Sequence, residues 1–403
     1  MSEKQYSISM GATDALQPIT TGIVAAITGF ASSFVLVIAG LRAVGASEAQ
    51  ASSGLLALCL LVGVACIALP WYFRMPVSFA WSTPGAALLV AAGTTTDNFG
   101  AAVGAFLVCG VLIVLCGLWP FLGRVITSIP KPLAGAMLAG ILFPICLAPI
   151  QAAIEQPLLA IPVLVVWLVL YRLAPRWAVP AAMVVAAIGI GSTAGLSWLS
   201  APTSAPSLVF VAPVFEPLVI VSVGLPLFVV TMAGQNVPGF AVLSTFGFRP
   251  PPRSVLVWSG IGTMVGSVFG AHNMNLAAIT AALMASPDAH QDASKRWIAT
   301  VASGFGYLVL GLGAGLATAL VAASPPILII AVAGLALLGA LVTSVTNALE
   351  EPEHRISAIA TFLVTASGVT LIGIGAAFWG LVVGGVFILW LGWRRPRVPG
   401  RQS

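Results

Sequence analysis

The sequence predicts an all-α polytopic membrane protein, and three observations carry that prediction. The 403 residues are 59% hydrophobic and only 7% charged, whereas about a quarter of the residues in a soluble domain are charged. Continuous apolar runs of about 20 residues, the length of a membrane-spanning helix, recur from Pro18 onward. The runs are unbroken rather than alternating, which disfavours a transmembrane β-barrel.

Twelve full-length apolar runs and two shorter segments give fourteen expected crossings. The full-length runs fall near residues 18–40, 49–70, 98–120, 132–150, 157–171, 178–198, 218–243, 254–270, 297–322, 326–347, 356–374 and 377–393. The shorter segments, 77–92 and 271–285, begin with polar residues and continue as helix-forming runs. Roughly nine or ten helical residues cover about half of a 30 Å hydrocarbon core. We therefore expect two short half-helices, each preceded by an extended stretch.

Capping residues indicate where these half-helices begin. In the first, Ser82 or Thr83 is a suitable N-cap, and Pro84 suits the first helical position. In the second, Asn273 or Asn275 is the expected N-cap. Interrupted helices at corresponding places in two halves of a membrane protein indicate a transporter binding site.

The basic residues test whether the short segments cross. With a cytoplasmic N-terminus and fourteen crossings, fifteen of the sixteen Lys and Arg residues lie on the inner face, and only Arg42 lies outside. If residues 77–92 did not cross, Arg124, Lys131, Arg172 and Arg176 would move outside. The distribution therefore predicts that both short segments cross, and that the tails at 1–17 and 394–403 are cytoplasmic.

A proline-rich stretch at residues 201–217 is predicted to be an external linker between two seven-segment halves. Because each half has an odd number of crossings, the halves have opposite orientations in the membrane. This arrangement is the seven-plus-seven inverted repeat of many secondary transporters.

Titratable groups are nearly absent from the predicted membrane interior. Every carboxylate falls in a loop, at a segment end or in the N-terminal tail, which disfavours an intramembrane acid pair or cation site. His272 is the exception, and an ionisable residue at membrane depth is a candidate for function. The alternative is a neutral imidazole hydrogen-bonded to freed backbone. We predict no metal and no cofactor, and the dispersed basic residues do not indicate nucleic-acid binding.

Other polar residues interrupt the apolar runs and are candidates to line a substrate site. They are Ser32, Ser33, Ser82, Thr83, Gln235, Asn236, Asn273 and Asn275, with Trp81 beside them. Buried amides and hydroxyls need partners in hydrocarbon, so each of these side chains either bridges or caps helices or faces a cavity. Two helix N-termini that converge at mid-membrane would favour an anion, especially a carboxylate, without any Arg or Lys.

Several strings in the sequence resemble the BenE family of benzoate:proton symporters. They are AWSTPGAAL at 80–88, TMAGQNVPG at 231–239, FGAHNMNLAAITAAL at 269–283, SPDAH at 286–290 and FLVTASG at 362–368. The similarity runs from about Pro18 to Trp393. It implies a relationship to uracil-permease and SLC26-like transporters. It also implies a core domain at 18–120 and 218–322, packed against a gate domain at 121–200 and 323–393.

In that fold the first, third, eighth and tenth segments line the substrate site. The resemblance therefore assigns the site to the residues at 32–33, 81–83, 235–236 and 272–275. Uracil-type relatives use carboxylates in the eighth and tenth segments, whereas Gln235 and Asn275 lie in those regions here. This difference fits an anionic substrate.

The expected function is import of benzoate or a similar aromatic carboxylate, together with a proton, across a bacterial inner membrane. His272 is the hypothetical proton-linked residue. The expected partners are the substrate, the proton and the lipid bilayer, and a homodimer is left open. The alternatives are a nucleobase or other small-anion carrier, a channel, and a membrane enzyme. An enzyme is disfavoured because the sequence shows no embedded nucleophile, base or metal-ligand set.

Overall fold

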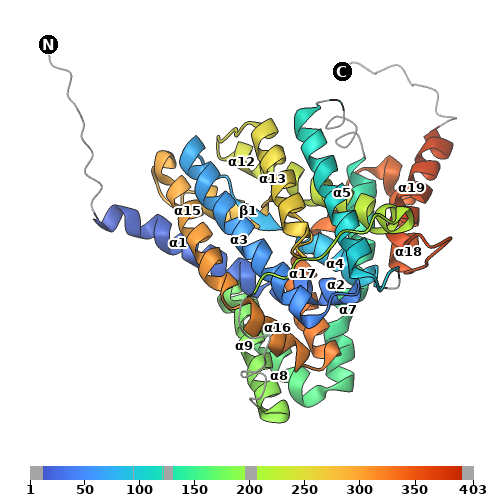
Figure 1. The fold of residues 1–403 in the computed structure, drawn as a ribbon, viewed down its shortest axis with the longest axis horizontal. Coiled ribbons are helices and arrows are strands. Elements are labelled where there is room, and N and C mark those ends of the chain that lie inside the picture. Colours follow the sequence, from blue (N-terminus) through green and yellow to red (C-terminus); the bar gives the residue numbers. More distant parts are fainter. Residues whose placement is uncertain (1–11, 94, 120, 122–129, 196–206, 393–403) are drawn as a thin grey trace.

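The computed structural model of the chain describes residues 12–93, 95–119, 121, 130–195 and 207–392. Their regular structure is almost entirely helical (Figure 1). In the first half the helices are α1 (Ala12–Ala31), α2 (Phe34–Ala43), α3 (Glu48–Phe73), α4 (Thr83–Ala91), α5 (Phe99–Leu118), α7 (Lys131–Glu155), α8 (Pro157–Leu173) and α9 (Pro175–Ala194).

The second half contains more broken helices. They are α10 (Pro217–Val219), η3 (Ile220–Gly224), α11 (Leu225–Thr231), η4 (Met232–Asn236), α12 (Val237–Thr245), α13 (Pro252–Ser267), α14 (Ile279–Ala285), η5 (Ala293–Lys295), α15 (Trp297–Gly311), α16 (Ala314–Ala322), α17 (Pro326–Leu349), η6 (Pro352–His354), α18 (Arg355–Ala366) and α19 (Ala376–Gly392). Two three-residue strands, β1 (Phe79–Trp81) and β2 (Met274–Leu276), complete the described elements.

Seven helical stretches in the described part of the chain are long and apolar enough to cross a membrane. An eighth arises if α15 and α16, which meet at a 55° bend, form one span. The apolar helices α8 and α19 are shorter. Because a helix satisfies its own backbone hydrogen bonds, it is one of the few structures that hydrocarbon tolerates. The chain is therefore a multi-pass α-helical membrane protein, as its composition predicted.

The helices pack in two groups (Figure 1). In the first group, α3 and α1 both pack against α15, and α5 packs against α13. In the second group, α7 packs against α17 and α18, while α8 packs against α9. The groups meet chiefly where α2 contacts α17, where α4 contacts α7 and where α1 contacts α9.

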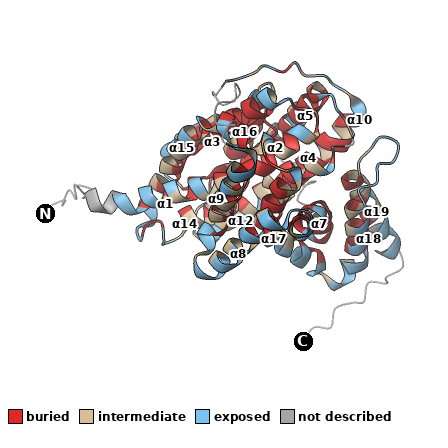
Figure 2. Cartoon of the chain, turned by 90° about the horizontal axis from the view of Figure 1, so that it is seen from below, coloured by how far each residue is buried: buried red, intermediate tan, exposed pale blue. Residues whose placement is uncertain are grey.

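Side-chain burial follows this packing. Buried residues concentrate in α2 to α5 and in α7, whereas the outward sides of α8 and α9 are exposed (Figure 2). The exposed residues on these two helices include the apolar side chains Leu158, Val165 and Ile188. An apolar outer surface suits contact with lipid chains, which need no hydrogen bonds from the protein.

Glycines allow the backbones of the first group to approach closely. A Cβ at Gly54 of α3 would overlap the carbonyl oxygen of Gly270, which lies after α13. Gly270 has a φ of +86°, a left-handed conformation that other residues adopt only with strain. This turn directs the chain from α13 back into the interior, where β2 follows.

Replacing Gly54 with Ala should lower the thermal midpoint of the detergent-solubilised protein, because the new methyl group has no room. Overpacking of this kind costs about 1–3 kcal/mol. Gly339→Ala in α17 is the matched control, since a Cβ there meets no atom within 4 Å. The control should leave the midpoint unchanged or raise it, because Ala is the better helix former. Equal midpoints for the two variants would contradict the packing at Gly54.

Candidate substrate site

β1 and β2 pair antiparallel in the interior, beside α3, α13 and η4 (Figure 1). Phe79 lies opposite Leu276, and Trp81 lies opposite Met274. A backbone hydrogen bond continues the pairing at each end, from Ser82 N to Asn273 O at 3.3 Å and from Ala277 N to the carbonyl oxygen of residue 78 at 2.9 Å. Because the strands are antiparallel, the helices that follow them, α4 and α14, leave the pair at opposite ends.

The start of α4 is fixed by a side-chain cap. Ser82 Oγ accepts a hydrogen bond from Gly85 N at 3.0 Å, and Pro84 lies in the first turn. The prediction that Ser82 or Thr83 caps this helix is confirmed, with Ser82 as the cap. Thr83 is the first helical residue and is only half-buried.

The expected N-cap of the second short helix was wrong. α14 begins at Ile279 with Ala278 at the cap position, so neither Asn273 nor Asn275 caps it. The physical reason is the strand pairing, which keeps residues 273–277 extended and delays the helix. The two asparagines bond elsewhere: Asn275 Nδ2 donates to Leu276 O at 2.9 Å, and Asn273 Nδ2 donates to Thr231 Oγ1.

His272 is fully buried at the end of β2 that lies near α4. Its Nδ1 lies 2.7 Å from Asn273 Oδ1 and also faces the backbone N–H of Asn273. Its Nε2 has no hydrogen-bond partner among the described residues. The imidazole is therefore held at one nitrogen by its neighbour, while the other nitrogen is enclosed and unpaired.

The first helix is interrupted at Ser32 and Ser33, which lie between α1 and α2. The hydroxyls of both serines donate to Gly29 O, at 3.0 and 2.8 Å. Ser33 Oγ also accepts a hydrogen bond from Trp81 Nε1 at 2.9 Å. The Trp81 ring packs edge-on against Phe30 and Tyr307, with centroid distances of 6.1 and 5.5 Å. This contact fixes β1 to the break between α1 and α2.

Gln235 and Asn236 lie in η4, a π-helical turn within the helix that runs from 217 to 245. Single π-helical turns are frequent at functional sites. Asn236 is fully buried; its Oδ1 accepts from Leu276 N at 2.8 Å, and its Nδ2 lies 3.3 Å from the Met232 sulfur. Gln235 is only partly buried.

Two hydroxyl-bearing residues that the sequence analysis did not select complete the support of β2. Ser259 Oγ donates to Met274 O at 2.6 Å, and Thr263 Oγ1 accepts from Met274 N at 3.0 Å. Both residues lie on α13, four positions apart, and so share one helix face. Two hydroxyl residues four positions apart inside an apolar run are the sequence signal that could have identified them.

Burial divides the ten predicted site residues into two sets. Seven are buried, and the contacts above join most of them to neighbouring segments: Ser33, Trp81, Ser82, Asn236, His272, Asn273 and Asn275. The other three, Ser32, Thr83 and Gln235, are partly exposed. The buried set supports the strand pair, whereas the other three side chains keep part of their surface uncovered.

A cleft of about 380 Å³ separates η4 and α12 from α7 and α17. Residues that line it include Lys131, Leu138, Ala233, Gly234, Val237, Pro238, Ala241 and Asn347. Lys131 is the only charged side chain among the described residues of this lining. Gly234, which lines the cleft, is next in sequence to the partly exposed Gln235. The cleft could not be predicted from the sequence, because its walls come from residues about 100 positions apart.

A second opening of about 190 Å³ lies between α1, α9 and α14. It is lined by Thr20, Thr21, Val24, Thr28, Arg176 and Leu283. The residues from α1 recur at helical spacing, and Ser32 comes four positions after Thr28.

The opposite side of the site is nearly closed. The cavity between α4 and the α18–α19 region is only about 30 Å³. There Ser222 Oγ donates to Gly373 O at 3.0 Å and accepts from Gly375 N at 3.3 Å. These two hydrogen bonds join η3 in the first helix group to the loop before α19 in the second.

Comparison with known proteins gives one consistent family. The family model described as BenE, benzoate membrane transport protein, matches residues 13–389. The chain is 40% identical over 368 residues to the inner membrane protein YdcO of Escherichia coli, covering 91% of this chain and 94% of that protein. It is 33% identical over 318 residues to the benzoate membrane transport protein of Acinetobacter baylyi, covering 77% and 79%.

Two solved transporter structures share the fold. The transmembrane domain of a cyanobacterium bicarbonate transporter, BicA, has a TM-score of 0.56 at 16% identity, covering 92% of this chain and 97% of that one. Murine Slc26a9, in the inward-facing state, has a TM-score of 0.55 at 13% identity, covering 98% and 69%. At these identities the similarity shows the fold alone, and it confirms the predicted SLC26-like fold.

Replacing Asn236 with Ala should destabilise the protein by about 1–3 kcal/mol, because the buried Leu276 N–H would lose its acceptor. Gln235→Ala is the neighbouring control, since that side chain is partly exposed and makes no hydrogen bond in the described structure. Thermal unfolding in detergent should separate the two variants. A midpoint for Asn236→Ala equal to that of the control would show that η4 does not hold β2 in place.

Proposed function

Because the chain belongs to the BenE family of membrane transporters, as its motifs predicted, we propose that it imports benzoate or a similar aromatic carboxylate with a proton. It is a transporter rather than an enzyme. The observation that supports the substrate class is the partly exposed set of Ser32, Thr83 and Gln235, in which Thr83 lies at the N-terminus of α4 and Thr83 and Gln235 are neutral donors. Such a site suits an anion without needing a buried cation.

The proposed topology has fourteen crossings in a seven-plus-seven inverted repeat, in a bacterial inner membrane with both termini cytoplasmic. The antiparallel pairing of β1 with β2, one from each half, supports the inversion. The two helix groups support a core domain at 18–120 and 218–322, and a gate domain at 121–200 and 323–393. The proposed topology is compatible with a homodimer, which light scattering of the solubilised protein would detect.

In the proposed site the carboxylate lies at the N-terminus of α4. Thr83 at this terminus offers a hydroxyl donor and Gln235 offers an amide donor, whereas Ser32 must first give up its hydrogen bond to Gly29 O. The partial positive charge of the helix end favours the anion. The buried residues Trp81, Asn236 and Asn273 position these groups through the strand pair. The described lining of the cleft contains no Asp or Glu that would repel the substrate.

The proposed transport cycle uses the interface between the two helix groups. The cleft beside Lys131 and the opening beside Arg176 lie on the proposed cytoplasmic side, while on the opposite side hydrogen bonds of Ser222 join the two groups around a cavity of only about 30 Å³. This arrangement corresponds to an inward-open state. To admit substrate from outside, the groups must shift so that the cleft closes and the hydrogen bonds of Ser222 to residues 373 and 375 break.

A co-transported proton makes import electrically feasible. A lone anion that enters a negative-inside cell works against about 2.3 kcal/mol per 100 mV, and one proton cancels that charge. His272 is the proposed proton-linked residue, because its Nε2 is unpaired and its Nδ1 adjoins Asn273 beside the site. Its complete burial means that a proton reaches it only when the surrounding segments move.

Uptake into proteoliposomes tests the function. We expect saturable, inward-proton-gradient-driven accumulation of labelled benzoate, inhibited by substituted benzoates and unaffected by the neutral ester methyl benzoate. Accumulation of uracil or an inorganic anion, with no accumulation of benzoate, would instead identify another carrier of this fold. A flux that neither saturates nor accumulates benzoate would identify a channel.

For His272→Gln we expect loss of the pH dependence of uptake, because glutamine cannot carry the proton. Exchange of labelled for unlabelled benzoate at equal pH on both sides should continue, since that reaction needs no net proton movement. His354→Gln is the control, because that histidine pairs with Glu351 in a loop far along the chain from the site. If proton-coupled uptake by His272→Gln keeps the wild-type pH profile, the assignment of the proton to His272 is wrong.

A further inference from the structure

A cavity of about 310 Å³ lies between α2, α4, α16 and α17. Pro326 and Ile329 of α17 line it, whereas the cleft described above is lined by residues near the other end of α17, including Asn347. The cavity therefore lies on the opposite side of the protein from that cleft. Because α2 belongs to the first helix group and α17 to the second, it also lies where the two groups meet.

The lining combines an apolar wall with one ion pair. Ile38, Val321 and Ile330 are among the apolar residues, and Arg42 and Glu48 are the only charged ones among the described residues of the lining. The volume falls at the lower end of the roughly 300–1,000 Å³ that is typical of small-molecule sites. Apolar walls with few polar groups that fix orientation are the usual composition of such sites.

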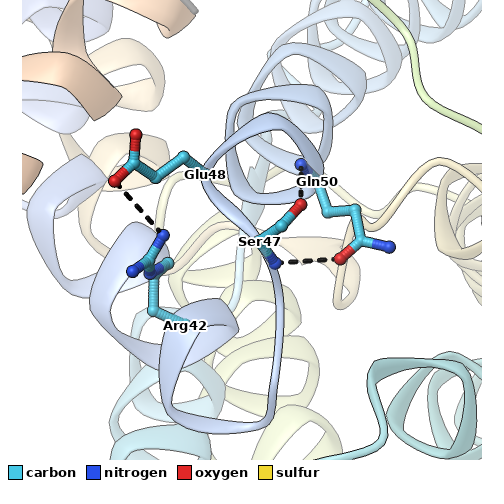
Figure 3. A network of polar contacts seen from close by, with 4 residues as sticks. All are labelled: Arg42, Ser47, Glu48 and Gln50. Atoms are coloured by element: carbon cyan, nitrogen blue, oxygen red, sulfur yellow. Dashed lines mark hydrogen bonds and ion pairs between the residues drawn. The ribbon is translucent and has the colours of Figure 1, made fainter.

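The ion pair is not needed to hold the local fold. Arg42 Nη1 lies 3.7 Å from Glu48 Oε1, and about half of each side chain is exposed, 45% and 46% (Figure 3). Such exposed pairs contribute about 0–1 kcal/mol to stability. The turn between α2 and α3 has its own support, because Ser47 and Gln50 form a reciprocal capping box with hydrogen bonds of 2.8 and 3.2 Å (Figure 3).

The guanidinium also has unused capacity. Glu48 approaches only one of its nitrogens, and Arg42 makes no hydrogen bond to any other residue in the described parts of the chain. An arginine fork can bind a carboxylate through two parallel N–H donors. No other basic residue is expected on the side of the protein where Arg42 lies. The segments that the proposed topology places there include 43–47, 92–98, 195–216, 323–325 and 367–375, and they contain no Lys or Arg. In the proposed topology Arg42 is the one basic residue on the outer face.

From these observations we propose that the Arg42 cavity is an outer binding site for the aromatic carboxylate, separate from the central site. The carboxylate binds the guanidinium of Arg42, the ring lies against the apolar wall, and Glu48 competes with the substrate for the same guanidinium. This inference rests on the proposed function for the identity of the ligand. The site retains the anion at the outer boundary of the two helix groups.

Uptake kinetics test the role of Arg42. Arg42→Gln should raise the KM for benzoate about tenfold, as the loss of one charge-assisted interaction implies, and should leave the maximal rate nearly unchanged. Arg42→Lys should raise the KM less, and Glu48→Gln should lower it by removing the competitor. Arg249→Gln is the control, because it removes the same charge from an exposed arginine after α12.

Kinetic results of two kinds would overturn the site. One is a wild-type KM for Arg42→Gln in a preparation that elutes as the wild-type protein does. The other is an equal rise in KM for Arg249→Gln, which would show that the effect comes from net surface charge rather than from binding at Arg42. If the wild-type protein takes up no benzoate at all, the proposed function is wrong. The binding experiment then tests the outer site independently of uptake.

Binding is measured through a thiol placed in the cavity. Ala43 lines it and is partly exposed, and the five native cysteines are all buried. Benzoate should slow the reaction of Ala43→Cys with a charged maleimide, and the isosteric neutral amide benzamide should not. In a double variant that carries both Ala43→Cys and Arg42→Gln, benzoate should no longer slow the reaction with the maleimide. Absence of protection by benzoate, or equal protection by benzamide, would refute a carboxylate site at Arg42.

Discussion

The structure depends on one requirement: backbone N–H and C=O groups freed inside the membrane must find partners within the protein. The chain is interrupted in its interior before α4 and before α14, and the two interruptions satisfy each other by forming β1 and β2. Hydroxyls and amides from neighbouring helices complete the pairing. Ser259 and Thr263 bind the backbone of Met274, and Asn236 binds that of Leu276.

This requirement explains why buried amides and hydroxyls gather around the strand pair. Asn236 is tolerated because its side chain accepts from the Leu276 N–H, which has no helical partner, and Asn273 is tolerated because Thr231 satisfies its amide. Most of the polar side chains at the interruptions make hydrogen bonds that hold the interrupted segments in place. Ser32, Thr83 and Gln235 are only partly buried. In the proposed site they contact the substrate, while their buried neighbours support the strand pair.

The two helix groups place this polar centre at a boundary. On one side of the boundary a cleft reaches toward the centre, and on the other side Ser222 joins the groups. Small residues make the arrangement compatible with relative movement. At Gly234 an added Cβ would meet only Leu138, at 3.6 Å, so the cleft wall there is open. Within the first group, by contrast, Gly54 is in tight contact with the turn at Gly270.

The sequence by itself determined the membrane class, the positions of most helices, the polar interruptions at 82–83 and 272–275, and the family. These properties are local, because hydropathy, run length and motif identity are set by consecutive residues. The pairing of residues 79–81 with 274–276 was decided by the tertiary structure alone, since nearly 200 residues separate the partners. That pairing is why the asparagines do not cap α14, why His272 is enclosed, and why burial separates supporting residues from accessible ones. A helix cap can be predicted from a few neighbours in sequence. The strand that keeps residues 274–276 extended, and so prevents the cap, lies in the other half of the chain.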